Sequence, residues 1–581
     1  MDKRWVLLDK AEGTGSTESA SFESISALSG ALCICASTAR VLINRGITDL
    51  DAASRFLNPS LSHFDSPFLL KGMEPAVKRI MSAIDAGERI CIYGDYDVDG
   101  TSSTALLLLF LRSTGANCSY YIPDRMKEGY GMNCDAVRRL AGERTGLLVT
   151  VDNGISSYEE VELANSLGMD VIITDHHQLP PQLPEAHSII NPQQPDCPYP
   201  FKGLAGVGVV FNLVMALRSS LRDAGFWKGR EEPNIRKYLD LAALGTIADI
   251  VPLQEANRTI AVFGMKELSM ASRPGTKALV NVSGRSGEKM GTGIVGFQLA
   301  PRLNAAGRLS KADTGVRLLT TEDGQEAAAL ANALDCENRE RQEIEKKILQ
   351  EAIDMVEEGG LHKRPAIVLA SEKWHPGVIG IVASRIVEKY YRPALIIAIK
   401  DGQGKGSARS IEAFHLFEGL EKCGEHLVSF GGHKYAAGFT LDASNLDAFR
   451  QAFENAVSSS VSDEDFIPSL KLDGIASLDD IDDSLVEELE RLAPFGASNS
   501  EPVFMSQGVE VLSVRVLKDA HLKLQLRQGS KVLDAIAFNM VHKALSPGDS
   551  VDVAYSVSFN EWKGRRTVQL KVKDIKLSQN Y

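Results

Sequence analysis

Three short apolar segments between residues 89 and 174 end in polar motifs, and amphipathic stretches separate them. Segment 89–93 is followed by Gly-Asp-Tyr-Asp-Val-Asp-Gly, segment 147–151 by Asp-Asn-Gly, and segment 170–174 by Asp-His-His. Alternation of strand and helix predicts a parallel sheet. Neighbouring strands lie about 4.8 Å apart, and open parallel sheets bind ligands outside the carboxyl ends of their strands. We therefore expect the polar side chains to gather at the carboxyl ends of these strands. These side chains are Asp95, Asp97, Asp99, Asp152, His176 and His177.

A further acidic residue, Asp249, stands in the apolar stretch 245–252, where we expect it to be half-buried. Crowded carboxylates repel one another and are costly to desolvate, so divalent cations would stabilise such a cluster. Aspartate and histidine without a thiolate favour two Mn²⁺ or Mg²⁺ ions, which can clamp the oxygens of a phosphoryl displacement. Acid-rich turns are also typical of helix N-caps, so Asp99 or Asp152 alone would not indicate a metal site.

The remaining sequence predicts further domains. Residues 1–65 show helical patterns, and 321–358 predicts one helix of about 55 Å that could bridge two domains. Residues 365–456 repeat the alternation of strand and helix, and a Ser-rich linker at 457–465 follows. The tail alternates apolar and polar residues, which predicts a small antiparallel β-barrel or sandwich. We therefore expect an α/β multi-domain chain divided at 1–65, 66–320, 321–360, 361–457 and 466–581.

Charge is distributed unevenly along the chain. The net charge of −13 taken alone argues against a nucleic-acid partner. Residues 502–581, however, hold 12 Lys and Arg against seven Asp and Glu, a net of +5, which leaves −18 for the rest. A local basic groove decides nucleic-acid binding more than net charge does. The eight cysteines form no CxxC pair, and no apolar run is long enough for a membrane, so we expect a cytoplasmic protein.

Four of these segments resemble the motifs of the DHH phosphoesterase superfamily. They are, in chain order, GDYDVDG, VDNG, DHH and GTIADIVPL. Later segments, PRLNAAGRL at 301–309, KGSARS at 405–410, GGHKYAAG at 431–438 and PFGASNSEP at 494–502, are similar to signatures of one bacterial branch, the exonucleases specific for single-stranded DNA. The resemblance covers nearly the whole chain from about residue 70 and rests on a specific set of motifs.

This resemblance implies a fold and an activity. The expected fold is a parallel-sheet DHH domain, a long connecting helix, a second α/β domain of DHHA1 type and a C-terminal OB-like barrel. The expected activity is 5′→3′ hydrolysis of single-stranded DNA to mononucleotides, with two Mn²⁺ or Mg²⁺ ions, in DNA repair and recombination. A monomer is expected, with single-strand-binding protein and a repair helicase as partners and no membrane.

The resemblance also assigns roles to the polar side chains by position. Asp97 and Asp99 would ligate one metal each, Asp152 would bridge the two ions, and His176 and Asp249 would complete the second site. Asp95 would lie beside the first site as a ligand or a base, and His177 would face the scissile phosphate. Tyr93 stands where pyrophosphatase relatives have a metal-binding histidine, which leaves open whether the first metal binds without substrate.

Other positions match those that hold the DNA end in this branch. Arg308, Ser407 and Arg409 would bind the terminal 5′-phosphate, since a guanidinium fork and a hydroxyl both donate to phosphate. Gly431, Gly432 and His433 would lie close to the strand. Without the resemblance, Arg409 is equally typical of a surface charge, and the glycines of ordinary turns.

The basic tail indicates single-strand binding. Lysines and arginines alternate there with Phe538, Tyr555, Phe559 and Trp562, an arrangement with which OB folds stack bases. On alternation alone Tyr555 and Phe559 are expected in the core, which leaves Trp562, beside a turn, as the better stacking platform.

Two alternatives remain open at this point. A superfamily member acting on very short RNA or cyclic dinucleotides would share the acidic motifs but lack the basic β tail. A non-catalytic scaffold would have lost metal ligands, whereas here only the Tyr93 position departs from the pattern.

Overall fold

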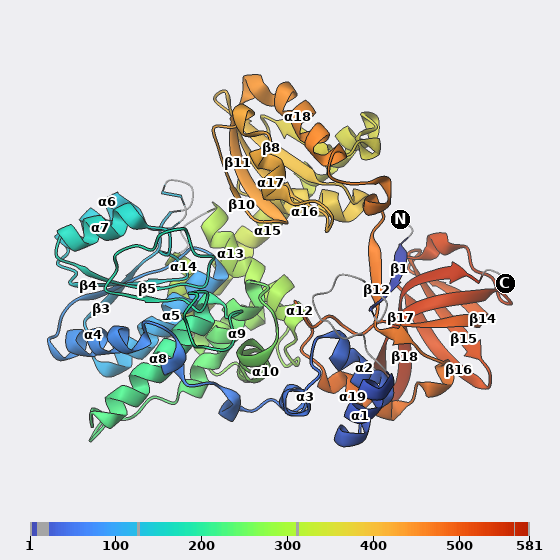
Figure 1. The fold of residues 1–581 in the computed structure, drawn as a ribbon, viewed down its shortest axis with the longest axis horizontal. Coiled ribbons are helices and arrows are strands. Elements are labelled where there is room, and N and C mark those ends of the chain that lie inside the picture. Colours follow the sequence, from blue (N-terminus) through green and yellow to red (C-terminus); the bar gives the residue numbers. More distant parts are fainter. Residues whose placement is uncertain are drawn as a thin grey trace. The chain divides into compact units, whose positions relative to one another are not determined.

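The computed structural model describes residues 3–8, 22–124, 128–129, 131–309, 313–562 and 564–578. The chain divides into two compact units (Figure 1). One comprises Met1–Arg4, Ala305–Lys311 and Asn332–Ser469, and the other Trp5–Asn304, Ala312–Ala331 and Leu470–Tyr581. Each unit is described separately below. No single helix among the described residues has the length and apolar composition of a membrane span, although the bent pair Glu23–Leu32 and Ala36–Asn44 passes that test jointly.

The larger unit contains the predicted parallel sheet. Its strand order is β3-β2-β4-β5-β6, and every neighbouring pair is parallel. The strands are β2 (Ile90–Tyr93), β3 (Cys118–Tyr121), β4 (Leu147–Val151), β5 (Asp170–Thr174) and β6 (Ser188–Ile190). The predicted segments correspond to β2, β4 and β5, whereas β3, whose Cys-Ser-Tyr-Tyr sequence is only half-buried at the edge, was not predicted.

Helices cover both faces of this sheet. On one face α6 (Cys134–Gly142) and α7 (Tyr158–Ser166) share a core with alternate strand residues such as Cys91, Leu148 and Val171. On the other face lie α4 (Met73–Asp85), α5 (Val98–Thr114) and α8 (Gly206–Asp223), followed by α9 (Leu239–Ala248) (Figure 1). Because α5 packs against the sheet, α8, α9 and α14 (Asp313–Thr320), it is buried on nearly all sides. Its ends are set by Asp97, which accepts from Gly100 N, and by the left-handed Gly115.

Further helices extend the larger unit beyond the sheet. They are α10 (Glu255–Met270), α11 (Pro274–Val282), α12 (Thr292–Ile294), a π-helix (Val295–Leu299), α13 (Ala300–Leu309), whose residues from Ala305 on belong to the smaller unit, and α14 (Asp313–Thr320). The long helix α15 (Gly324–Glu358) starts three residues later than predicted. Pro301 lies inside the run from α12 to α13 and has no N–H to donate to the preceding turn, which accounts for the π-helical segment.

The C-terminal part of the larger unit is a closed β-barrel, as the resemblance implies, but its strands are not all antiparallel, because β16 (Lys531–Ala537) and β18 (Arg565–Leu577) pair in parallel. The strands β14 (Phe504–Leu517), β15 (His521–Gln528), β16 (Lys531–Ala537), β18 (Arg565–Leu577) and β17 (Ser550–Trp562) follow one another, and β14 also pairs with β17. Three further strands are short: β1 (Arg4–Leu7), β12 (Ser469–Leu472) and β13 (Gly474–Ile475).

The N-terminal helices belong to the core of this barrel. Residues from α1 (Phe22–Leu32), α2 (Ala36–Asn44), α3 (Leu50–Leu57) and α19 (Asp483–Arg491) form one hydrophobic cluster with the barrel strands. A buried ion pair of 3.0 Å between Arg45 and Asp473 ties the N-terminal helices to the segment that precedes the barrel. The N-terminal segment, whose role the sequence leaves open, therefore contributes core residues to the barrel.

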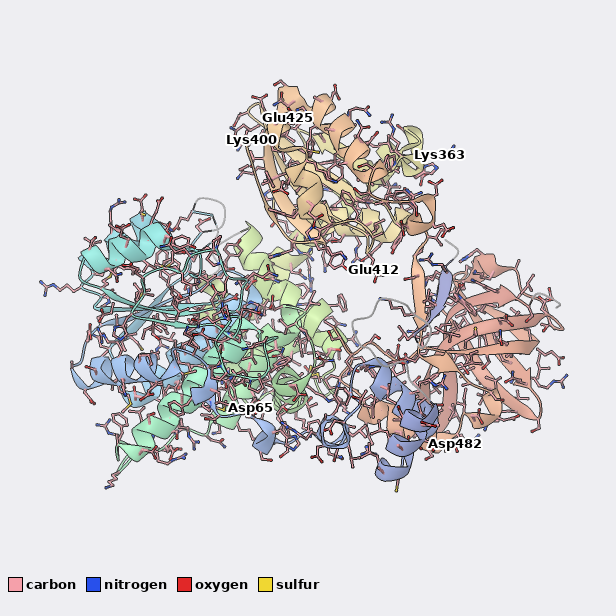
Figure 2. All side chains as sticks on the ribbon, in the orientation of Figure 1. Asp65, Lys363, Lys400, Glu412, Glu425 and Asp482 are labelled. Atoms are coloured by element: carbon pink, nitrogen blue, oxygen red, sulfur yellow. The ribbon has the colours of Figure 1, made fainter. Side chains whose placement is uncertain are left out.

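The smaller unit holds a five-stranded mixed sheet with the order β10-β11-β9-β8-β7. Its strands are β7 (Ile367–Ser371), β8 (Ala394–Lys400), β9 (Gln403–Arg409), β10 (Ser429–Gly432) and β11 (Ala436–Asp442), and only β7 and β8 are parallel. The helix α16 (Ile379–Tyr390) and the end of α15 cover one face, while α17 (Leu416–Glu421) and α18 (Leu446–Ser458) cover the other. Figure 2 shows Lys400, at the end of β8, and Glu412, just after β9, on opposite sides of this unit.

Candidate metal centre and substrate-binding residues

The acidic residues lie where the order of the parallel strands reverses. The chain passes from β2 to β3 on one side and then to β4 on the other side of β2. The helix after β2, α5, lies on one face of the sheet, and the helix after β4, α7, on the other. Such a switch point leaves a crevice outside the carboxyl ends of the two strands. Asp95 and Asp97 follow β2, and Asp152 follows β4, so the fold directs these carboxylates to the same crevice.

All seven predicted residues of the cluster come together there. Ligand atoms within 4.8 Å of one another form three groups, and the groups share members. The groups are Asp95, Asp97 and Asp152; Asp99, His176 and Asp249; and Asp152, His176 and His177. Asp152 belongs both to a group with Asp97 and to a group with His176, so it is shared by two candidate ligand groups.

The imidazole of His176 has the surroundings of a cation ligand. Its Nε2 lies 3.1 Å from Asp152 Oδ1, 3.6 Å from Asp249 Oδ2 and 3.9 Å from Asp99 Oδ2. Three carboxylate oxygens around one buried nitrogen fit a shared cation better than a single hydrogen bond. Burial, followed by the charge of His177, lowers the pKa of His176 to about 4. The ring is therefore neutral near pH 7, which is the form that binds metal.

The acidic side chains are strongly destabilised as anions. Burial raises the pKa of Asp99 well above its usual value, and the charges of Asp249 and Asp97 add to this. Burial and then the charge of Asp99 act in the same way on the pKa of Asp152. Burial followed by the charge of Asp97 raises the pKa of Asp249 to about 7. Divalent cations would remove the repulsion, so the donor set of carboxylates and one neutral imidazole fits Mn²⁺ or Mg²⁺.

Glycines leave the space that these carboxylates occupy. A Cβ on Gly206 would lie 2.7 Å from Asp152 Oδ1, and a Cβ on Gly245 would lie 2.6 Å from Asp99 Oδ1. Gly206 N and Val207 N, at the start of α8, donate to the two oxygens of Asp99 at 2.7 and 2.9 Å. The start of α8 thus holds Asp99 by two hydrogen bonds, and the lack of a side chain at Gly206 leaves the space for Asp152.

The sequence prediction missed Asp175, which orients His177. The buried Asp175 carboxylate accepts hydrogen bonds from Ile155 N, His176 N and His177 N, and its Oδ1 lies 2.7 Å from His177 Nδ1. Burial opposes the charge of His177, but the hydrogen bond and charge of Asp175 outweigh it and raise the pKa of His177 to about 9. The cationic ring suits a role opposite an anionic phosphate. The only signal in the sequence is the position of Asp175 directly before two histidines.

Tyr93 does not take part in the ligand groups. Its buried hydroxyl donates to Gly131 O and accepts from Asn133 Nδ2, both at 3.2 Å. Burial raises the pKa of the phenol, so it stays protonated. The first group therefore depends on Asp95, Asp97 and Asp152, whose oxygens meet without it.

In the smaller unit, Ser407 and Arg409 lie beside the start of α16. A Cβ on Gly380 would lie 2.9 Å from Ser407 Oγ and 3.3 Å from an Arg409 guanidinium nitrogen. Arg409 Nη1 donates to Ser407 Oγ at 3.3 Å and to Ala408 O at 2.8 Å. A guanidinium, a hydroxyl and the amino end of a 12-residue helix together make a local environment suited to an anion.

Gly431, Gly432 and His433 reach the same end of this sheet. Gly431 pairs with Gly438, which in turn pairs with Ser407. His433 N donates to Ala436 O at 2.8 Å, and Ala436 pairs with Arg409. The two predicted groups of substrate residues therefore occupy neighbouring rows of β9, β11 and β10.

Family models match three parts of the chain. The DHH family N-terminal domain matches residues 89–246, the DHHA1 domain residues 363–459, and the RecJ OB domain residues 472–574. Single-stranded-DNA-specific exonuclease RecJ of Bacillus subtilis is 42% identical over 563 residues, which are 96% of this chain and 70% of that protein. RecJ of Escherichia coli is 40% identical over 523 residues, which are 87% of this chain and 90% of that protein. The chain belongs to the RecJ family.

Solved RecJ structures share the fold. RecJ from Thermus thermophilus in complex with Mn²⁺ has a TM-score of 0.82 and 31% identity, and the match covers 96% of this chain and 78% of that one. The complex of the same RecJ with Mg²⁺ has a TM-score of 0.76 and 30% identity, covering 96% and 77%. The predicted architecture, a DHH domain, a DHHA1 domain and an OB-like barrel, is confirmed.

Two residues predicted to contact DNA in this RecJ family member lie outside the described side chains. The backbone of Arg308 belongs to α13, and that of Trp562 ends β17, but neither side chain is among those that the structure describes. Their roles therefore stay predictions from the sequence.

The described aromatics of the RecJ OB domain differ in exposure. Tyr555 is fully buried and shares a 2.7 Å hydrogen bond with Ser506, as the prediction of a core role requires. Arg566 covers the ring of Phe559 at 3.5 Å. Phe538 is 54% exposed, and His521 meets it edge-on at 5.3 Å between ring centres. Phe538 is thus the exposed aromatic among those described in this part of the barrel.

Proposed function

We propose that this protein is a metal-dependent 5′→3′ exonuclease that hydrolyses single-stranded DNA to mononucleotides. The observation that carries the proposal is the gathering of seven acidic and histidine residues in the crevice between β2 and β4, in a chain of the RecJ family. RecJ relatives are named as exonucleases specific for single-stranded DNA, and solved RecJ structures hold Mn²⁺ or Mg²⁺.

Each residue of the crevice would have a distinct task. Asp95, Asp97 and Asp152 would hold one divalent cation, and Asp99, His176 and Asp249 the other, with Asp152 touching both. When bound, such a pair of cations supplies charge neutralisation for the phosphate and a water of lowered pKa.

His177 would act on the substrate itself. Its ring carries a positive charge below about pH 9 because Asp175 holds the proton on Nδ1. A cationic ring in this place would stabilise the charge that develops on the scissile phosphate. Because Asp175 already orients the ring, His177 would not have to move during the reaction.

The direction of hydrolysis would follow from end recognition in the smaller unit. Arg409, Ser407 and the start of α16 would bind the terminal 5′-phosphate, and Arg308 would add a second guanidinium. Gly431, Gly432 and His433 would contact the strand next to it. A pocket that requires a terminal phosphate admits an end and excludes an internal segment of DNA.

The barrel would hold the strand away from the reaction centre. Lys523 lies on β15 and Lys518 in the turn before it, while Phe538 directly follows β16, the strand that pairs with β15. The barrel segment is also the basic part of the chain. Phosphates would meet the cations while a base stacks on the exposed ring. Because its ring is exposed, Phe538 is a candidate for the stacking platform, a role for which the sequence alone favoured Trp562.

A role in DNA repair and recombination in the cytoplasm is consistent with the family. Single-strand-binding protein and a repair helicase would be the partners, and the chain would act as a monomer. Pulldown of purified candidates and light scattering of the free protein test these points directly.

Digestion of end-labelled oligonucleotides tests the proposed function. With Mn²⁺ present, a 5′-labelled single strand should release labelled mononucleotide at once, whereas a 3′-labelled strand should shorten progressively. Asp97→Ala and Asp152→Ala should abolish release while retaining binding of the strand. Release from the 3′ end first, or near-normal turnover by either variant, would refute the assignment.

The same assay separates the two alternatives. An enzyme for cyclic dinucleotides or very short RNA would degrade those faster than long DNA, and the RecJ OB domain favours long DNA. A non-catalytic scaffold would bind DNA without hydrolysing it at any Mn²⁺ concentration.

A further inference from the structure

Two apolar side chains of the larger unit are largely exposed, and one of them directly follows a candidate metal ligand. Among the residues that the structure describes, Phe297 and Ile250 are the most exposed large apolar residues, at 82% and 75%. Ile250 directly follows Asp249, one of the candidate metal ligands. An exposed apolar residue alone needs no explanation, but one that directly follows a candidate metal ligand does.

The backbone of Ile250 is held in an unfavourable conformation. Its φ angle is +60°, a left-handed value that β-branched residues rarely adopt. Glycine or asparagine would fit this position without strain, so the isoleucine side chain is present despite its conformation. Strained residues of this kind concentrate at functional sites, where a side chain must point in a given direction.

Phe297 lies in the π-helix that Pro301 produces. A π-helical turn inserts one residue into a helix and changes the direction of the side chains around it. The neighbouring Gly296 faces α9, because a Cβ there would lie 3.9 Å from Ile247 Cγ2. Ile247 O in turn accepts from Ile250 N at 3.4 Å. A short chain of contacts therefore connects the backbone next to Phe297 with the backbone next to Asp249.

We propose that Ile250 and Phe297 bind the nucleobase beside the scissile phosphate, as an apolar ledge on which this base stacks. The proposal rests on the proposed function. An aliphatic and an aromatic surface contact the face of any of the four bases without reading its sequence, as a nuclease that degrades a whole strand requires. A base still paired in a duplex has its faces covered by its neighbours, so the ledge would also favour unpaired DNA.

Removal of the base from the substrate tests this ledge. One oligonucleotide carries normal bases, and another has tetrahydrofuran abasic residues at the first two positions of its 5′ end. For the wild-type protein, kcat/KM should fall about 5- to 150-fold on the abasic strand, the range of one stacked base. On the normal strand, kcat/KM of Phe297→Ala should be lower than that of the wild-type protein by a similar factor. On the abasic strand, kcat/KM of the two proteins should be nearly the same.

Variants distinguish stacking from a structural effect. Phe297→Tyr should restore most of the difference between the two substrates, because a ring is restored. Ile250→Gly relieves the backbone and removes the side chain, so it should weaken discrimination between the substrates. Leu167 is an exposed apolar residue between α7 and the amino end of β5, away from the carboxyl ends of the strands. Leu167→Ala should therefore behave as the wild-type protein on both oligonucleotides.

The outcomes separate this inference from the proposed function. If the wild-type protein degrades single strands but Phe297→Ala keeps its full preference for the base-containing strand, the ledge is refuted. If Ile250→Gly changes only the affinity for Mn²⁺ and leaves the preference for the base-containing strand intact, Ile250 is not part of the ledge. If the wild-type protein degrades no single strand with Mn²⁺, the proposed function itself fails.

Discussion

Replacement of Gly206 by alanine should displace the bridging carboxylate. Gly206 is the first residue of α8, and the Cβ of an alanine there would lie 2.7 Å from Oδ1, 2.8 Å from Cβ and 2.9 Å from Cγ of Asp152. Rotation of the carboxylate cannot relieve all three contacts, because the Cβ of Asp152 is one of them. The backbone of one of the two segments must move.

The required movement exceeds what a metal site tolerates. Ordinary contact begins near 3.4 Å, so the two Cβ atoms must separate by about 0.6 Å. Metal–ligand distances vary by only about 0.2 Å. We expect Mn²⁺ affinity to fall about 10- to 100-fold, and turnover to fall by about 100-fold. Overpacking costs about 1–3 kcal/mol and helix propensity returns about 1 kcal/mol, so the protein should remain folded.

Calorimetric Mn²⁺ titration, combined with digestion of single-stranded DNA, measures this effect. Gly208→Ala is a matched control in the same turn of α8, because its Cβ would make its closest contact with the side chain of Leu204, at 3.3 Å. Gly208→Ala should keep wild-type affinity and turnover. If Gly206→Ala binds Mn²⁺ as tightly as wild type and cleaves at the same rate, the placement of Asp152 as a shared ligand is wrong.

Three further predictions concern charge. Arg409→Ala should weaken binding of 5′-phosphorylated DNA by about 1.5–3 kcal/mol and spare 5′-hydroxyl DNA in a fluorescence titration; equal loss on both would exclude phosphate binding. Asp175→Asn removes the partner that raises the pKa of His177, so the alkaline limb of kcat/KM should move from about pH 9 toward its usual value near 6.5; an unmoved limb would contradict this role. Mn²⁺ should bind about tenfold more weakly for each pH unit below 7, because the ion displaces a proton from Asp249; Asp249→Asn should flatten this dependence in calorimetry. Between pH 4 and 7 the folded, metal-free chain holds this proton and the unfolded chain does not. The contribution of Asp249 to the free energy of unfolding therefore falls as the pH rises. Urea titrations of the wild-type protein and of Asp249→Asn at several pH values would measure this.

Much of the fold follows from periodic patterns and strand punctuation. The bounds of β4 and β5 agree with the prediction because short apolar runs ended by Asp leave little choice of strand ends. The alternation in the tail predicts its strands, whereas closure of these strands into a barrel follows from the resemblance. The edge strand β3 was missed because its half-exposed Cys-Ser-Tyr-Tyr sequence has no apolar run.

The candidate site was predicted as a set of residues but not as a geometry. Parallel strands bring Asp97 and Asp152 to one crevice by topology, which a sequence reveals. The support of Asp99 by the start of α8, more than 100 residues away, depends on tertiary packing. For Asp175, three of the four donors belong to His176 and His177, and only Ile155 N comes from a distant part of the chain.

Anomalous diffraction from crystals grown with Mn²⁺ would show whether Asp152 is shared by two ions. We expect two anomalous peaks within coordination distance of Asp152, one also contacting Asp97 and the other also contacting His176 and Asp249. A peak pattern that leaves Asp152 without an ion, or that places Mn²⁺ elsewhere in the chain, would contradict it.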